Sequence, residues 1–191
     1  MSLLRPIRPA TIALATVLAF PMFANAQVQR NPIEQSLVQR PAGQTTENQK
    51  IDYKLLGSPM PEMRVVYPKK GTYTGNDFKN KSNLFVMLYN PTCEHCESMA
   101  MDMTKHIDLF KTSQIVMMAA PMMVPYLEFF ENTTKVQNFP KIKYGVDSSE
   151  FINKTFTYAG LPQINIYDAD RKLIKIFTGI ENVDSLKAYI Q

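Results

Sequence analysis

LFVMLYNPTCEHC, residues 84–96, is the stretch of this chain that decides how it is expected to fold. Its first six residues, 84–89, form an apolar run of strand length, and Asn90-Pro91-Thr92 then gives a turn signal. Beyond the turn, apolar side chains recur with a helical period and would share one helix face: Cys96, Met99, Ala100, Met103, Ile107 and Phe110. The stretch therefore predicts a buried strand with Phe85 and Tyr89 in the core, then a tight turn and an amphipathic helix.

The chain contains two cysteines, Cys93 and Cys96, and both lie at the start of this predicted helix. Two thiols at this spacing can close a disulfide with little backbone movement. Thiol–disulfide exchange needs one thiolate to attack and a second thiol to resolve the mixed disulfide. Cys93 precedes the first turn, where unpaired N–H groups and the helix dipole stabilise a thiolate, so it is the predicted attacking residue. Cys96 belongs to the apolar stripe, should be buried, and is the predicted resolving residue.

The two residues between the cysteines are candidates for tuning this chemistry. A protonated His95 would stabilise a Cys93 thiolate, whereas an ionised Glu94 would destabilise it. Because the two effects have opposite signs, the sequence does not set the redox potential of the pair.

The N-terminus has the pattern of a secretory signal peptide over residues 1–26. Arg5 and Arg8 precede an apolar run, Ala24-Asn25-Ala26 is a small-x-small cleavage site, and no acidic residue occurs before Glu34. An uncleaved membrane anchor is the alternative, disfavoured by Pro21 and by the short apolar run. We therefore expect an exported, periplasmic or extracytoplasmic protein, with a flexible polar leader at residues 27–54 and one domain at residues 55–191.

The composition excludes few classes of protein, but the net charge bears on which partners the chain can bind. The formal net charge is +4, and loss of Arg5 and Arg8 with the signal peptide leaves +2, which does not favour nucleic acid. No second long apolar segment follows, so we expect a soluble monomer. Export places the thiols in an oxidising compartment, where disulfides persist. A disulfide that spans only two intervening residues closes a very short loop and therefore stabilises the fold very little. A redox pair is therefore favoured over a structural disulfide.

The sequence of the rest of the domain predicts further strands and helices in a regular order. Expected strands lie at residues 63–67, 114–119, 141–146, 163–167 and 172–178. Pro125 is expected to open a helix that ends near Val136, residues 150–156 form a short helix, and Asn182 is expected to cap a last helix. The expected order of elements is strand, helix, strand, helix, strand, then a hairpin and a helix. This order predicts an α/β fold with a central mixed β-sheet flanked by α-helices.

These motifs together resemble the thioredoxin-like superfamily, in particular its exported TlpA-type, redoxin-like thiol–disulfide oxidoreductases. The resemblance covers roughly residues 55–191. It is carried by the strand leading into Cys93–Cys96, by Gly160-Leu161-Pro162 before the next strand, and by residues 57–61. It implies a thioredoxin-like fold and a cis Pro162 that faces the cysteines. It also implies that the Leu161 backbone docks a substrate chain.

The resemblance further implies protein substrates with thiols or disulfides, no cofactor, and a membrane redox partner that recharges the pair. Reduction of substrates is the expected direction. Two departures from the family pattern stand out. Thr92 replaces the tryptophan common before the first cysteine, and Met87 replaces a buried acid that helps deprotonate the resolving thiol.

Two other functions remain open at this point. Thioether and thiolate ligands suit Cu(I), and the chain has 12 methionines, but methionine is also a common core residue. The chain could instead be a non-catalytic binding or redox-sensing module. A zinc site is disfavoured because the chain offers two cysteines and two histidines in total, so no metal site is predicted.

Overall fold

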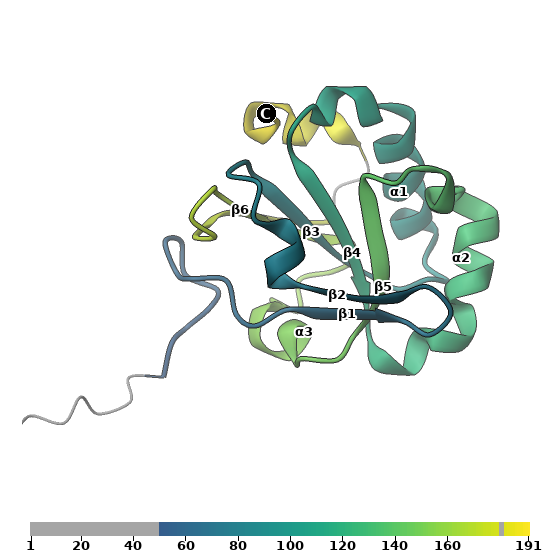
Figure 1. Ribbon diagram of the computed structural model, residues 1–191, viewed down its shortest axis with the longest axis horizontal. Coiled ribbons are helices and arrows are strands. Elements are labelled where there is room, and N and C mark those ends of the chain that lie inside the picture. Colours follow the sequence, from purple (N-terminus) through teal and green to yellow (C-terminus); the bar gives the residue numbers. More distant parts are fainter. Residues whose placement is uncertain (1–49, 180–181) are drawn as a thin grey trace, which may run out of the picture. The chain divides into compact units, whose positions relative to one another are not determined.

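Seven strands form one mixed sheet in the computed structural model, which describes residues 50–179 and 182–191 (Figure 1). The strands are β1 Arg64–Tyr67, β2 Gly71–Thr74, β3 Leu84–Tyr89, β4 Gln114–Ala119, β5 Ile142–Asp147, β6 Gln163–Tyr167 and β7 Leu173–Thr178. Their order across the sheet is β2-β1-β5-β4-β3-β6-β7. Strands β3, β4 and β5 run parallel, and every other pairing is antiparallel. The predicted signal peptide and the predicted leader up to residue 49 lie outside the described residues.

Strand β3 is buried along its whole length, as the continuous apolar run predicts. Its side chains alternate between two cores, one on each face of the sheet. Phe85, Met87 and Tyr89 enter one core, and the residues between them enter the other. The strand that leads to the cysteines is therefore fixed from both sides.

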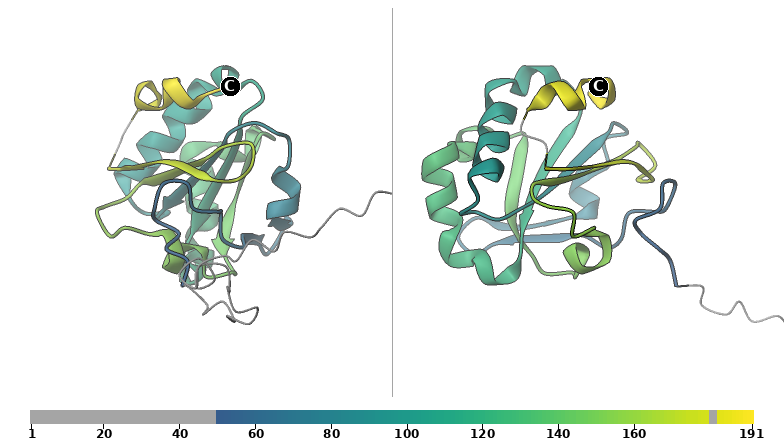
Figure 2. Two further views of the ribbon diagram at one scale, coloured as in Figure 1. Left: turned by 90° about the vertical axis from the view of Figure 1, so that its left-hand side faces the viewer. Right: turned by 180° about the vertical axis from the view of Figure 1, so that it is seen from behind.

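Helices cover both faces of the sheet (Figures 1 and 2). The α-helices are α1 Glu94–Lys105, α2 Leu127–Thr134 and α3 Phe151–Thr155. Short 3₁₀ helices are η2 Gly75–Phe78, η3 Ile107–Phe110, η4 Pro121–Tyr126, η5 Val136–Asn138 and η6 Val183–Tyr189. Side chains from α1, α2 and η6 fill the core that contains Tyr89, and η2 and α3 pack on the opposite face. The predicted mixed sheet flanked by helices is confirmed.

The apolar stripe of α1 forms much of the core on its face. Cys96, Met99, Ala100 and Met103 have no exposed surface. Met117 and Met118 of β4 are also fully buried, one in each core. These methionines pack against other apolar side chains, which is the packing role considered for them above.

Three local expectations were wrong or incomplete. Pro125 lies inside η4 and α2 begins two residues later, so the proline does not open that helix. Asn182 precedes η6 but its side chain forms no cap hydrogen bond; the N–H of Val183, the first residue of η6, donates to Asp102 Oδ2 of α1 at 2.6 Å. Strand β2 was not predicted, since its four residues carry no alternating apolar pattern.

None of the helices within residues 50–179 and 182–191 has the length and hydrophobicity required to cross a lipid bilayer.

Candidate redox site

The turn that presents the cysteines is held by Asn90. Its side-chain Oδ1 accepts hydrogen bonds from the backbone N–H and the hydroxyl of Thr92, both at 3.0 Å. Its carbonyl accepts the N–H of Cys93 at 3.1 Å. Asparagine commonly fixes a turn in this way, because its side chain can bond to the backbone two residues ahead. The position of Cys93 is therefore fixed by its own loop.

Cys93 is the N-cap residue of α1, with extended backbone angles φ −100° and ψ 118°. Its carbonyl accepts the N–H of Glu97 at 3.0 Å, the first hydrogen bond of the helix. The Cys93 side chain is partly exposed, whereas Cys96 has no exposed surface, and neither thiol is in a disulfide. The burial expected for Cys96 is confirmed.

Burial changes the acidity of Cys96 strongly. The pKa of its thiol is raised to about 12, chiefly by the loss of water, and a hydrogen bond with the Cys93 side chain and the charge of Glu97 contribute to that rise. An interaction with the backbone of Asn90 opposes it. At neutral pH Cys96 is therefore almost entirely a protonated thiol, and its attack on a mixed disulfide requires removal of that proton.

The tuning candidates Glu94 and His95 both lie in the first turn of α1 and are exposed. The sequence analysis missed a third residue, Glu97, which is half-buried and lies one helical turn after Cys93. Burial raises the pKa of Glu97, and the charge of Glu94 raises it further. Its position directly after Cys96, whose pKa its charge raises, was the signal that could have identified it.

Leu161 and Pro162 lie at the same edge of the sheet as the cysteines. Strand β6 runs antiparallel to β3, and Gln163 pairs with Leu88 near the end of β3. The residues just before β6 therefore lie beside the turn that leads to Cys93. Leu161 and Cys93 both pack against the same core, and the Leu161–Pro162 peptide bond is cis, as the resemblance implies. The Pro162 carbonyl accepts the N–H of Gly179 at 2.9 Å.

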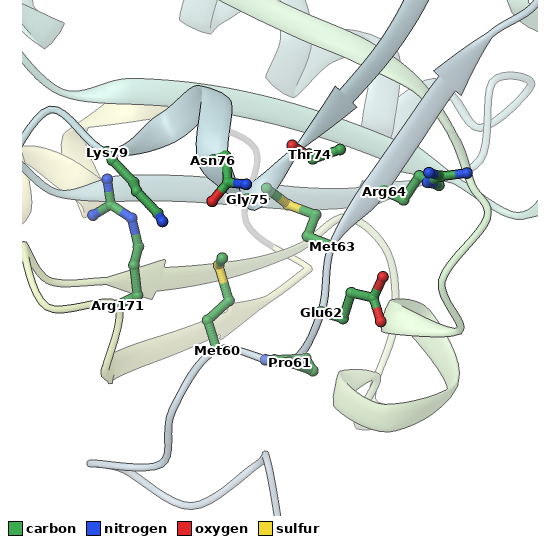
Figure 3. Close-up of a pocket in the computed structure, with 10 residues that line it drawn as sticks. All are labelled: Met60, Pro61, Glu62, Met63, Arg64, Thr74, Gly75, Asn76, Lys79 and Arg171. Atoms are coloured by element: carbon green, nitrogen blue, oxygen red, sulfur yellow. The ribbon is translucent and has the colours of Figure 1, made fainter.

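A pocket of about 370 Å³ lies elsewhere, and none of the predicted site residues lines it (Figure 3). Its lining comes from the segment before β1 and the first residue of β1, from the end of β2, from η2 and the residue after it, and from Arg171. The Arg171 guanidinium donates to the carbonyls of Ser82 and Asp168 at 2.8 and 2.6 Å and also to that of Phe78. Arg171 thus fastens the η2 region to the β6–β7 turn.

Within the described part of the chain, no three His, Cys, Asp or Glu side chains gather in a group that could hold a metal ion. Met101, close to the cysteines in sequence, is partly exposed on α1, while Met99 and Met103 point into the core.

Comparison with solved structures identifies the fold. The thioredoxin domain of a thiol–disulfide oxidoreductase from Bacteroides vulgatus matches with a TM-score of 0.57 at 15% identity, over 72% of this chain and 99% of that one. A thiol:disulfide interchange protein from a Bacteroides species matches with a TM-score of 0.55 at 15% identity, over 71% and 90%. A secreted disulfide oxidoreductase from Mycobacterium tuberculosis matches with a TM-score of 0.53 at 13% identity, over 66% and 92%. No protein-family model and no curated protein matches the chain.

Proposed function

We propose that this chain, which has a thioredoxin-like fold, is an exported thiol–disulfide oxidoreductase that exchanges disulfides with protein substrates. One observation carries the proposal. A partly exposed Cys93 at a helix start lies one turn from a buried Cys96 with a strongly raised pKa. That asymmetry suits an accessible attacking sulfur and a resolving sulfur held in reserve.

The exchange proceeds in two balanced steps. The Cys93 thiolate attacks one sulfur of a substrate disulfide, a Cys93–substrate disulfide forms, and the other substrate sulfur leaves as a thiolate that takes up a proton. Cys96 then loses its proton and attacks the Cys93 sulfur. The Cys93–Cys96 disulfide forms, and the second substrate sulfur leaves and takes up a proton. The substrate disulfide is reduced and the cysteine pair is oxidised.

The remaining site residues receive supporting roles. Leu161 offers its backbone to an extended substrate segment beside Cys93, and the cis Pro162 shapes that face. Glu94 and His95 tune the potential from the exposed side of the pair. The two sulfurs carry both electrons, so no cofactor is required. A membrane redox partner would return the pair to the dithiol form after each cycle.

Cysteine variants test the proposal. Cys93→Ser should abolish reduction of a model disulfide such as insulin, because the attacking sulfur is lost. Cys96→Ser should accumulate a mixed disulfide, visible by mass spectrometry as a reducible adduct on Cys93. If Cys93→Ser reduces insulin as fast as the native chain, Cys93 is not the attacking residue and the proposal fails. If the native chain itself reduces no insulin, a binding module is favoured instead.

The reduction potential, measured in glutathione buffers by thiol trapping, sets the direction. A value near −270 mV, typical of thioredoxin, supports a reductant. A value near −120 mV would instead make the protein a disulfide donor and contradict the reductive direction proposed here.

A further inference from the structure

In the turn between β3 and α1, every backbone N–H between Asn90 and the helix bonds to Asn90 itself. Pro91 has no N–H, so Thr92 and Cys93 carry these donors. The N–H of Thr92 donates to Asn90 Oδ1 at 3.0 Å, and that of Cys93 donates to the Asn90 carbonyl at 3.1 Å. The Thr92 hydroxyl is a second donor to Oδ1, also at 3.0 Å. We call these three hydrogen bonds the Asn90 clamp.

The clamp connects Cys93 to the buried part of the sheet. Asn90 directly follows Tyr89, which is 3% exposed and pairs with Ala119 at the end of β4. Pro91 is buried, and its ring restricts the backbone of the turn. Cys93 is partly exposed and is the N-cap residue of α1, where its side chain makes no cap hydrogen bond. The position of Cys93 therefore depends largely on the turn.

Cys96 is held by different means. Its side chain has no exposed surface and packs in the core, so its sulfur stays where the helix places it. The backbone of Asn90 also acts on this thiol: burial raises the pKa of Cys96, and an interaction with that backbone opposes the rise. A disulfide has narrow limits on its length and dihedral angle. Closure of the pair thus requires that Cys93 be held correctly against a sulfur that cannot itself move far.

We propose that Asn90 is a positioning residue for this closure: with Thr92, it holds the Cys93 sulfur where Cys96 attacks it, and so favours the disulfide form of the pair. The inference rests on the function proposed above. In the step itself the Cys96–Cys93 bond forms and the bond from Cys93 to the substrate sulfur breaks. That sulfur leaves with the electron pair and takes up a proton, and Cys96 gives one up. Asn90 exchanges no proton.

The physical effect is pre-organisation of the reduced pair. An attack within one molecule is favoured when the reacting atoms are already held in the productive geometry. Without the clamp the reduced turn samples more conformations, and closure has to restrict them at a cost in conformational entropy. The disulfide becomes less favourable relative to the dithiol. The first attack by Cys93 needs only an accessible sulfur, so it changes little.

Equilibration of the full chain with reduced and oxidised glutathione tests the proposal. Thiol trapping gives the equilibrium constant for formation of the Cys93–Cys96 disulfide, and alkylation by iodoacetamide reports the attacking sulfur of Cys93 alone. Asn90→Ala removes both bonds to Oδ1 and should lower the constant about tenfold, the effect of one to two hydrogen bonds. This corresponds to a rise of about 30 mV in the reduction potential. The alkylation rate should stay within about twofold of the native rate.

Two variants of Thr92 grade the effect. Thr92→Ser keeps the hydroxyl and should keep the native constant. Thr92→Val removes the hydroxyl, retains the N–H, and should lower the constant about threefold. Because Thr92 is exposed, its substitution is compatible with folding, and it decides the question if Asn90→Ala does not fold.

Asn80→Ala is the matched control. Asn80 Oδ1 also accepts an N–H from two residues ahead, that of Ser82 at 3.3 Å, but this turn precedes β3, at the opposite end of the strand. Asn80 also donates to the Thr112 carbonyl at 2.6 Å, so its loss perturbs the fold at least as much. The constant should keep its native value. The proposal is overturned if Asn90→Ala and Thr92→Val leave the constant unchanged, if Asn80→Ala lowers it equally, or if alkylation of Cys93 slows by the same factor.

Failure of this inference differs from failure of the proposed function. A native chain that forms the disulfide with glutathione but reduces no insulin contradicts the function alone. Reduction of insulin by the native chain, with the same equilibrium constant in the native chain and in Asn90→Ala, contradicts the positioning role alone.

Discussion

At the scale of single residues, the pKa of Cys96 controls the second step of the proposed reaction. Glu97 is the side chain whose substitution changes that pKa most simply. The carboxylate of Glu97 raises the pKa of Cys96, and burial raises the pKa of Glu97 itself. Glu97→Gln keeps the size of the side chain and removes its charge. We expect the pKa of Cys96 to fall. When the reduced chain reacts with the aromatic disulfide 5,5′-dithiobis(2-nitrobenzoate), Cys93 releases one thionitrobenzoate and Cys96 then releases a second, and stopped-flow absorbance at pH 7 should show the second phase accelerated by about twofold to fivefold.

The control for this prediction is Glu62→Gln, which removes the same charge from an exposed residue that lines the pocket of Figure 3. It should leave the second phase unchanged. An equal acceleration in both variants would show that net charge, and not the neighbourhood of Cys96, determines the rate.

At the scale of elements, Asp102 joins α1 to the C-terminal 3₁₀ helix η6. One carboxylate oxygen accepts the N–H of Val183 at 2.6 Å, and the other lies 3.2 Å from Nδ1 of His106. Asp102→Ala leaves that N–H without its cap, so we expect the free energy of unfolding to fall by about 1–2 kcal/mol. Urea denaturation at pH 7 measures the loss.

Asp184→Ala provides the comparison at this scale, because Asp184 lies in the same 3₁₀ helix and its carboxylate forms an exposed ion pair with Lys187. Surface pairs of this kind contribute little. Equal losses in the two variants would argue against a specific role of the Asp102 cap.

At the scale of the whole molecule, Glu131 connects three separate parts of the chain: the β1–β2 turn through Lys70, α2, and β5 through Tyr144. Burial alone would raise the pKa of Glu131, but its hydrogen bonds with Lys70, Tyr144 and Tyr67 outweigh burial and lower it. A lowered folded-state pKa contributes stability that is present above the unfolded value, about 4.3, and is lost as the pH falls through the folded value.

The expected consequence is a pH dependence of stability that Glu131→Gln reduces. The native chain should lose stability between about pH 5 and pH 3 more steeply than the variant. The variant is itself less stable at pH 7, because the Lys70–Glu131 ion pair is lost. Urea denaturation across this range tests both points. Glu128→Gln is the control, because Glu128 and Lys69 are mostly exposed and form an ion pair at 3.5 Å. If stability fell with pH in parallel for Glu131→Gln and the native chain, the prediction would be contradicted.

The sequence by itself determined the elements around the cysteines. The strands over residues 84–89, 114–119 and 163–167 were predicted with the bounds that the structure has. The helix after the cysteines was also predicted, but it ends at Lys105, and the last two residues of its predicted apolar stripe, Ile107 and Phe110, lie in η3. These features depend on hydrophobic period and turn residues, which act over a few positions along the chain. The burial of Cys96 followed from the same local pattern.

Only the tertiary structure decided how distant residues meet. Residues 161 and 162 reach the edge beside Cys93 because β6 pairs antiparallel with β3, and Val183 is capped by Asp102, 81 positions earlier in the chain. The high pKa of Cys96, and the lack of a hydrogen-bond partner for the buried Tyr89 hydroxyl within the described part of the chain, depend on what surrounds each group in space. Local periodicity specifies which face of an element is buried, but the partners of a buried polar group are set by long-range packing, which no short stretch of sequence contains.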